Sequence, residues 1–169
     1  MKTQWKYFLL AFVVPLVAIL WWVGAFTDVT VETSQMRGPY HYAYLANGGD
    51  YSKLPDRQLQ ALGELKAQGV EHGAGLTVMQ NDPRTTAKDK LMAQTGYLVA
   101  ADAKVREPLR LADIPARQVV VAHVRATPRL ATGKVYAALL KYLDTNGMRL
   151  KVPTVEIYRN SELSVEMDI

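Results

Sequence analysis

The two halves of the chain share one order of helix and strand signals, and this internal repeat constrains the fold more than any other feature. A constant shift of 78 residues superposes the halves without a gap over residues 31–82. Within this alignment Leu65 falls on Leu143 and Gly69 falls on Gly147, so a core leucine and a helix C-terminal glycine agree in both halves. Identity between the halves is low, so generic strand and helix patterning stays open as the alternative.

The residue pattern predicts two helices, over residues 55–68 and 133–146. Pro55 can open the first helix and Thr132 can cap the second. Extended segments are predicted around them, over residues 28–36, 76–79, 96–101, 109–111, 117–125, 155–158 and 163–169. This order predicts an α+β fold of duplicated β-α-β-β units with pseudo-two-fold symmetry. We expect an antiparallel sheet with helices on one face and a ligand cleft on the other.

The N-terminal part of the chain differs from the rest, because residues 7–26 carry no charge. A helix of 20 such residues is roughly 30 Å long, which matches the hydrocarbon thickness of a bilayer. Lys2 and Lys6 precede the run, and Asp28 and Glu32 follow it. This asymmetry predicts a single-pass helix in the cytoplasmic (inner) membrane, with the N-terminus inside and the domain outside, in the periplasm.

The predicted organisation is therefore a transmembrane anchor over residues 1–26 and one domain over residues 27–169. A cleaved signal peptide is the alternative, because Val23, Gly24 and Ala25 are small enough for a peptidase. The apolar run is longer than that of most signal peptides, which favours the anchor.

Composition excludes several classes of protein. The chain has no cysteine, which excludes disulfide frameworks, thiol nucleophiles and cysteine metal sites. Its three histidines are widely separated, and it lacks the common hydrolase, phosphate-binding and dinucleotide-binding motifs. The formal charge is +4, but the basic residues are scattered, so nucleic acid is not an expected partner. We predict no catalytic residue, no metal and no cofactor.

Four short motifs occur in a characteristic order along residues 28–169. They are Arg37-Gly38-Pro39-Tyr40, Asn81-Asp82-Pro83, a helix with Tyr136, Leu139, Tyr142 and Leu143, and a late group with Pro153, Glu156 and Tyr158. In this order the chain resembles the GyrI-like effector-binding domain family, which also forms the ligand-binding half of multidrug-responsive bacterial transcription activators. The resemblance implies a cleft between the two repeats that holds bulky, often cationic aromatic compounds. It also implies that Glu156 lies in that cleft.

The residues around Glu156 support a similar interpretation without the family. Period-two alternation places Glu156 and Tyr158 on one strand face, with Val155 and Ile157 on the other. If helices cover the Val155 face, Glu156 faces a cleft. A carboxylate there needs a cation, a hydrogen-bonded tyrosine or a cationic ligand, because an uncompensated buried charge is unfavourable. An ordinary solvent-facing glutamate is the alternative.

Aromatic residues supply further candidates for ligand binding. Tyr40, Tyr42, Tyr44 and Tyr51 crowd the stretch before the first predicted helix, where they can stack on a flat cation or serve as packing residues. We take Tyr40 and Tyr42 as candidate ligand-binding residues, beside Glu156 and Tyr158. His123 completes this candidate set, although we expect it to be a strand residue and not a catalytic base.

Three functions stay open at this stage, and the missing motifs favour a binding protein over an enzyme. The first is a membrane-anchored domain that binds bulky aromatic or cationic lipophilic compounds as a sensor or scavenger. The second is a hydrolase of strained cyclopropane-bearing toxins that uses a pocket glutamate, as the family resemblance allows. The third is a protein-interaction module. No particular ligand or protein partner is predicted.

Overall fold

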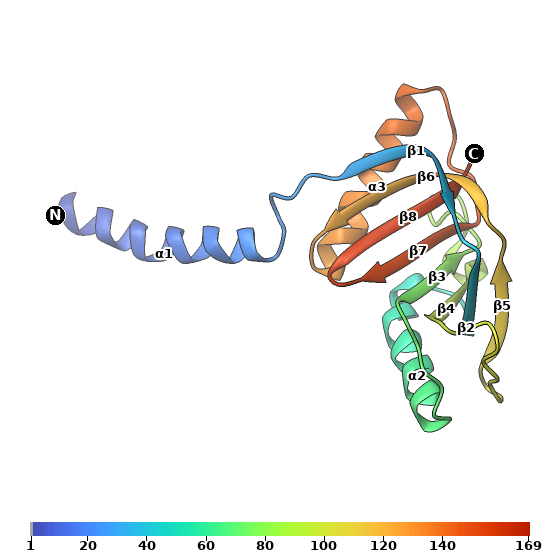
Figure 1. Cartoon of the computed structure of the whole chain (residues 1–169). Coiled ribbons are helices and arrows are strands. Elements are labelled where there is room, and N and C mark those ends of the chain that lie inside the picture. The colour runs from blue at the N-terminus through green and yellow to red at the C-terminus, as the bar shows by residue number, and fades with distance from the viewer. Residues whose placement is uncertain (1) are drawn as a thin grey trace.

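The computed structural model describes residues 2–169, and for residues 2–4, 6, 8 and 129 it describes the backbone alone. Its helices are α1 (Lys2–Trp22), η1 (Tyr51–Lys53), α2 (Leu54–Ala67), η2 (Lys88–Lys90) and α3 (Pro128–Thr145). Its strands are β1 (Thr30–Arg37), β2 (Tyr40–Gly48), β3 (Gly75–Met79), β4 (Met92–Leu98), β5 (Arg110–Ile114), β6 (Arg117–Arg125), β7 (Thr154–Arg159) and β8 (Glu162–Asp168). These strands form one antiparallel sheet in the order β1-β6-β8-β7-β3-β4-β2-β5 (Figure 1).

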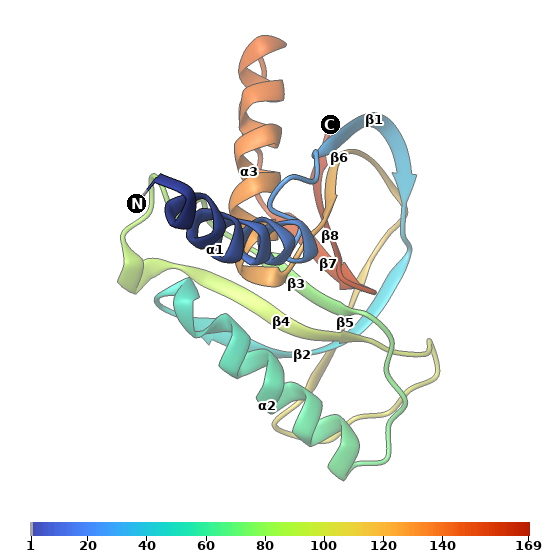
Figure 2. The ribbon, with the colours of Figure 1, turned by 90° about the vertical axis from the view of Figure 1, so that its left-hand side faces the viewer.

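The sheet consists of two similar units placed side by side. β2, α2, β3 and β4 form the first unit, and β6, α3, β7 and β8 form the second. β3 and β7 pair at the centre, so the strand order of one unit mirrors that of the other, as a pseudo-two-fold axis requires. Both helices lie on one side of the sheet, α2 against the first unit and α3 against the second (Figure 1, Figure 2). The predicted α+β fold of duplicated units is confirmed.

The two units exchange the strands that precede them. β1 precedes the first unit but pairs with β6, and β5 precedes the second unit but pairs with β2. The two connections cross at Gly38, whose φ is +89°. A Cβ atom at this position would lie 3.0 Å from the carbonyl oxygen of Pro115. The close crossing and the positive φ together explain why glycine occupies position 38.

The largest differences between the predicted elements and the structure concern β2 and α3. The predicted set of strands omits β2, which pairs on both sides, with β4 and β5. α3 begins at Pro128 and not at the predicted residue 133, because Thr127 takes the N-cap position and Pro128 suits the first turn. Thr132 therefore lies inside the helix, where its hydroxyl donates to the Pro128 carbonyl over 3.3 Å.

Alternation along the strands divides the apolar core between the two faces of the sheet. On the helix side, residues of β6 and β8 such as Val124 and Val165 pack against α3, while Leu45 of β2 packs against α2. On the other side, Val155 and Ile157 of β7 join residues of β2 and β3 in a separate cluster. Glu156 therefore points to the helix side of the sheet.

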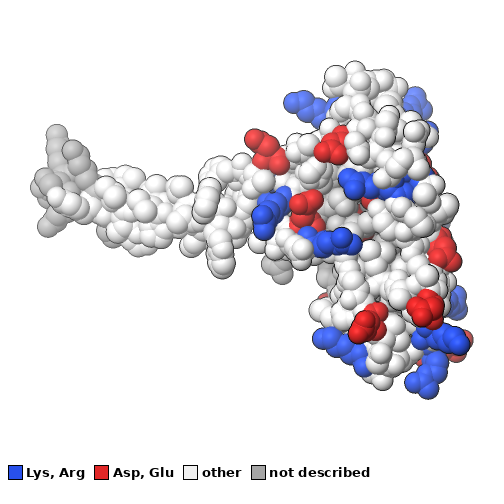
Figure 3. All heavy atoms as spheres, in the orientation of Figure 1, with Lys and Arg blue, Asp and Glu red and all other residues white. Residues whose placement is uncertain are grey.

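α1 extends away from the sheet (Figure 1) and presents an uncharged surface over its described side chains (Figure 3). No helix in the part of the chain that the structure describes is long and apolar enough to cross a membrane. This finding contradicts the predicted anchor over residues 7–26 with the domain on the outer side of the inner membrane, and that prediction is wrong.

The helix α1 ends at Trp22, before the end of the uncharged run. The purely apolar part of this helix covers residues 8–20, with Pro15 inside it. At about 1.5 Å per residue it is roughly 20 Å long, which is shorter than the hydrocarbon layer of a bilayer. The flanking charges Lys2 and Lys6 have side chains outside the described part.

The chain that follows α1 is attached to α3 by one lysine. Lys134 Nζ donates to the carbonyl oxygens of Gly24, Ala25 and Thr27, over 3.2, 2.8 and 2.5 Å. A backbone hydrogen bond of 3.2 Å from Thr127 to the Val23 carbonyl lies beside them. The charged donor satisfies carbonyl groups that the end of a helix leaves open.

Candidate functional site

A cavity of about 460 Å³ lies on the helix side of the sheet, between the first turns of α2 and α3. Its floor comes from the central strands β3 and β7, which contribute Thr77, Met79 and Glu156. Its walls carry tyrosine rings and aliphatic side chains, namely Tyr51, Leu54, Leu59, Tyr97, Tyr158 and Leu163. The volume and the mixture of rings and few polar groups are typical of small-molecule sites.

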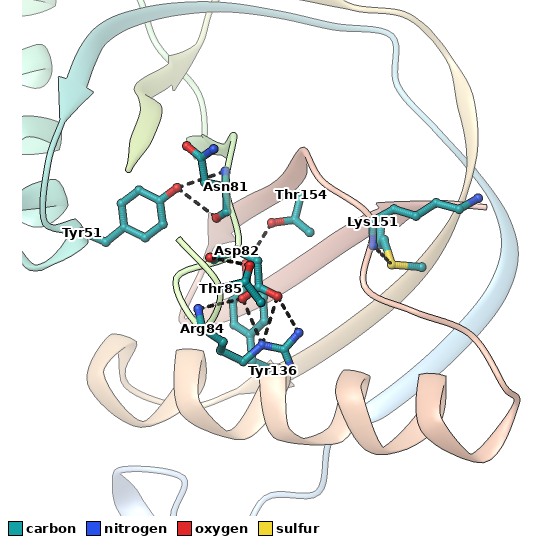
Figure 4. Close-up of polar contacts among 9 residues, drawn as sticks. Tyr51, Asn81, Asp82, Arg84, Thr85, Tyr136, Lys151 and Thr154 are labelled. Atoms are coloured by element: carbon teal, nitrogen blue, oxygen red, sulfur yellow. Dashed lines mark hydrogen bonds and ion pairs between the residues drawn. The ribbon is translucent and has the colours of Figure 1, made fainter. Parts of the chain in front are cut away.

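Glu156 is held on the cavity floor by a tyrosine of α3. Tyr136 donates its hydroxyl hydrogen to Glu156 Oε1 over 2.8 Å. The same hydroxyl oxygen lies 3.0 Å from Thr154 Oγ1 and 3.2 Å from Met79 Sδ (Figure 4 shows the contact with Thr154). The second carboxylate oxygen of Glu156 has no hydrogen-bond partner among the described residues. This leaves one oxygen of the carboxylate open to a ligand.

The electrostatic surroundings of Glu156 are unusual for a carboxylate below a layer of helices. Burial raises the pKa of Glu156, and the hydrogen bond from Tyr136 only partly offsets this effect. Glu156 is the one charged side chain among the described residues that line the cavity, and no described Lys, Arg or His forms an ion pair with it. The pKa of Tyr136 is raised well above its ordinary value by burial and by the nearby Glu156 charge, so the hydroxyl remains a donor.

Hydrogen bonds hold two further residues that line the cavity, Tyr51 and Thr77. The Tyr51 hydroxyl can donate its one hydrogen to the carbonyl oxygen of Met92, at 2.9 Å, or of Asn81, at 3.1 Å, and it accepts from the Asn81 amide (Figure 4 shows the contacts with Asn81). Thr77 and Thr95 share a buried hydrogen bond of 2.7 Å between their hydroxyl oxygens. These bonds fix the positions of Tyr51 and Thr77, and none of them involves the free carboxylate oxygen of Glu156.

The structure separates the candidate residues into three places. Glu156 and Tyr158 line the cavity between the helices. Tyr40 and His123 line a different hollow on the opposite face of the sheet. Tyr42 is 3% exposed and belongs to the apolar cluster on that opposite face, where it donates to Gln94 Oε1 over 2.5 Å. Their roles in ligand binding stay predictions, and the geometry brings together only Glu156 and Tyr158.

The premise used to orient Glu156 is reversed in the structure. The helices cover the Glu156 face of β7, and Val155 and Ile157 lie on the other side. A cavity nevertheless forms at Glu156, because the two helices contact different units of the sheet and leave the central strands β3 and β7 open between them. The pairing of distant strands decides this arrangement, so local alternation could not predict it.

Sequence analysis missed the residue that holds Glu156. Tyr136 was named only as part of the helix motif that carries the family resemblance, although it donates to a carboxylate. A tyrosine on the core-facing side of a helix normally needs a hydrogen-bond partner when it is buried, which is the signal that could have identified it. Tyr97 and Met79 were likewise not singled out as site residues, and nothing in their local pattern distinguishes them from core residues.

The hollow on the opposite face has a volume of about 590 Å³ and contains a buried glutamate, Glu166 of β8. Glu166 is 2% exposed and accepts hydrogen bonds from Tyr40, at 2.7 Å, and from Arg117 Nη2, at 3.0 Å. Arg117 also donates to Asp168 over 2.6 Å, and its guanidinium lies 5.9 Å from the centre of the Tyr40 ring. Burial raises the pKa of Glu166, but Tyr40 and Arg117 act in the opposite direction.

Comparison with solved structures identifies the architecture. The chain superposes on EcmrR in a cryo-EM structure of an EcmrR–DNA complex with a TM-score of 0.63 and 12% identity, over 84% of this chain and 57% of that chain. The crystal structure of the EcmrR C-terminal domain gives a TM-score of 0.62 and 15% identity, over 84% and 96% of the two chains. SAV2435 bound to tetraphenylphosphonium gives 0.57 and 8% identity, over 83% and 93%. No curated protein sequence was found to match the chain.

The fold and the cavity together define a small-molecule binding domain of duplicated α+β architecture. The family model of the GyrI-like small molecule binding domain matches residues 34–168. The chain therefore belongs to the GyrI-like family. It spans little more than half the length of the EcmrR chain in the DNA complex, and the structural similarities at these low identities show a common fold.

Proposed function

We propose that this protein binds a lipophilic cation in the cavity between α2 and α3, with Glu156 as the counter-charge. The observation that carries the proposal is a carboxylate beneath the helices with one tyrosine donor and no cationic partner among the described residues. A bound cation would supply the missing charge in a site of low polarity.

The walls of the cavity suit an aromatic cation. Tyr51, Tyr97 and Tyr158 present rings, and a cation on a ring face gains about 0.5–2 kcal/mol. Leu59 and Leu163 add apolar surface that a lipophilic ligand can cover. SAV2435, which shares the fold, was solved with tetraphenylphosphonium, a cation of this class. A protein that binds such compounds stoichiometrically, without turnover, would act as a sensor or a scavenger.

Isothermal titration calorimetry on the full chain tests the proposal with tetraphenylphosphonium and with neutral triphenylphosphine oxide. Glu156→Gln keeps the shape of the side chain and removes the charge. Because a charge-assisted contact contributes about 1.5–3 kcal/mol, we expect the variant to bind the cation roughly ten- to a hundredfold more weakly. The affinity for the neutral compound should change little.

Glu162→Gln is the matched control, since Glu162 is an exposed glutamate on β8 outside the cavity. It should bind both compounds as the parent does. Unchanged cation affinity in Glu156→Gln, with an intact fold by circular dichroism, would refute the charge role of Glu156. Turnover of a cyclopropane-bearing electrophile, lost in Glu156→Gln, would favour the hydrolase alternative.

A further inference from the structure

The Glu156 cavity contains one carboxylate and, among the described residues that line it, no cationic side chain to balance the charge. The strand neighbours of Glu156 are Thr77 of β3 and Val165 of β8, and neither side chain titrates. Tyr136 of α3 is the one hydrogen-bond donor to the carboxylate within the described part of the chain. A partly buried carboxylate in such surroundings lowers its free energy in one of two ways, because it either binds a cation or takes up a proton.

The other titratable groups that line the cavity are tyrosines. They lie on three elements, with Tyr51 on η1, Tyr97 on β4 and Tyr158 on β7. A tyrosine hydroxyl ordinarily titrates near about pH 10, and burial raises the pKa of Tyr51 and of Tyr97 above this value. The lining residues from α2, α3, β3 and β8 are aliphatic, threonine, glutamine, methionine, glycine or proline residues, so none of them titrates. Among the described lining residues, Glu156 is therefore the group whose charge changes in mildly acid conditions.

Charged side chains behind the cavity walls are held by other partners. Asp82, whose charge acts on Tyr51, binds Arg84 over 2.6 Å (Figure 4). The hydrogen bonds from Arg84 lower the pKa of Asp82 below its ordinary value of 3.8, so Asp82 stays charged in mildly acid conditions. Lys134 of α3 donates to the carbonyl oxygens that follow α1. Neither Asp82 nor Lys134 lines the cavity.

Of the three histidines, His72 is the one that lies beside the cavity. Its ring packs edge-on against Tyr97, with 5.2 Å between the ring centroids. His123 lines the hollow on the opposite face of the sheet, and His41 pairs with an aspartate of β5. Because histidines ordinarily titrate near neutral pH, a pH titration of the site must separate His72 from Glu156.

We propose that the cavity exchanges its cationic ligand for a proton on Glu156, so that mildly acid conditions release the ligand. The proposal rests on the function proposed above and adds its regulation. The second carboxylate oxygen has no partner among the described residues, so it is open to a proton from the solvent when no ligand is bound. When the cation enters, Glu156 returns this proton to the solvent. Burial raises the pKa of Glu156 and Tyr136 offsets this only in part, so the exchange begins above pH 4.5.

The exchange predicts how affinity depends on pH. A protonated glutamate has no charge, so at low pH the parent should bind tetraphenylphosphonium as weakly as Glu156→Gln does. That limit lies roughly ten- to a hundredfold below the affinity of the parent at pH 8. Within this range the affinity should fall by up to about tenfold per pH unit, because one proton competes with one cation. The affinity of Glu156→Gln should stay constant.

Isothermal titration calorimetry of the full chain with tetraphenylphosphonium, from pH 8 down to pH 4.5, measures this curve. Circular dichroism at each pH confirms that the chain is folded. At the pH where affinity falls most steeply, titrations in two buffers with different ionisation enthalpies count the protons released on binding. We expect the parent to release up to about one proton per cation and Glu156→Gln to release none.

Tyr136→Phe tests whether the exchange takes place at Glu156. The hydrogen bond from Tyr136 lowers the pKa of the carboxyl group, so its loss favours the protonated form. The pH at which affinity falls should therefore be higher in Tyr136→Phe than in the parent. Tyr142→Phe, on the same helix and outside the cavity lining, should follow the curve of the parent. His72→Gln should follow it as well.

The possible outcomes separate this inference from the proposed function. Constant affinity of the parent from pH 8 to pH 4.5, with weaker binding by Glu156→Gln at every pH, overturns the exchange and leaves the cation site intact. A pH dependence that disappears in His72→Gln also overturns it, because the titrating group is then the histidine. If the parent binds no tetraphenylphosphonium at any pH, the proposed function fails and the exchange fails with it.

Discussion

Glu156 and Glu166 lie on adjacent strands of one sheet, but only Glu166 has a cationic partner among the described residues. Glu166, on the face away from the helices, is bound by Arg117 and by the hydroxyl of Tyr40. Glu156, on the helix side, has the Tyr136 hydroxyl and no cation among the described residues. Burial raises the pKa of both groups, but more interactions oppose the shift at Glu166.

The difference separates a structural carboxylate from a candidate ligand-binding one. Removal of one partner of a buried ion pair is costly, because it leaves an uncompensated charge. A buried charge that lacks a partner lowers stability in the free protein and leaves interaction energy available to a ligand. The following predictions test this contrast.

The largest effect is expected from Arg117→Met. The side chain of Arg117 is 13% exposed, and its loss removes the ion-pair partner of the buried Glu166 carboxylate. We expect the free energy of unfolding to fall by about 3 kcal/mol, measured by urea denaturation at pH 7. Arg110→Met, on an exposed position of β5, should stay within about 0.5 kcal/mol of the parent. Equal losses in both variants would show that the Glu166 ion pair has no special role.

An intermediate effect is expected from Tyr136→Phe. This change removes the donor to Glu156 Oε1 and leaves the ring in place. We expect a loss of about 1–2 kcal/mol in the free energy of unfolding, because a partly buried acceptor loses its only donor among the described residues. Tyr142→Phe on the same helix is the matched control, since the Tyr142 hydroxyl makes no hydrogen bond to the described residues. A similar loss in the control would argue against the Tyr136 to Glu156 bond.

The smallest effect concerns pH and Glu156. Its folded-state pKa lies above the ordinary value of 4.5, so the folded protein holds this proton more tightly than the unfolded chain. The stabilisation is complete below pH 4.5 and is lost as pH rises through the folded-state pKa. Glu156→Gln lacks this loss, so its stability relative to the parent should increase across that window. Parallel curves of unfolding free energy against pH for the two proteins would contradict the prediction.

The position of Glu156 shows how far the sequence leads. Period-two alternation correctly separates Glu156 and Tyr158 from Val155 and Ile157, because neighbouring side chains in any strand point to opposite faces. The same reasoning assigned the helices to the wrong face. Which face the helices cover depends on the apolar residues of all the paired strands, and one strand does not contain that information.

The tyrosine-rich stretch before α2 shows a different limit. Tyr40 and Tyr42 were grouped with Glu156 as candidate ligand residues, but β2 directs both to the opposite face. β2 was not predicted, and without it the direction of these rings is undefined. Tyr40 instead supports Glu166, a partner 126 positions away in the chain.

The sequence by itself determined the duplicated order of elements, the C-terminal glycines of α2 and α3 and the shared face of Glu156 and Tyr158. These features depend on residues within one or two turns or strands, where backbone geometry leaves few choices. Only the tertiary structure decided the exchange of β1 and β5 between the units, the opening between the helices and the hydrogen-bond partners of Glu156 and Glu166. These features arise from pairing between segments far apart in the chain, which local patterns do not encode.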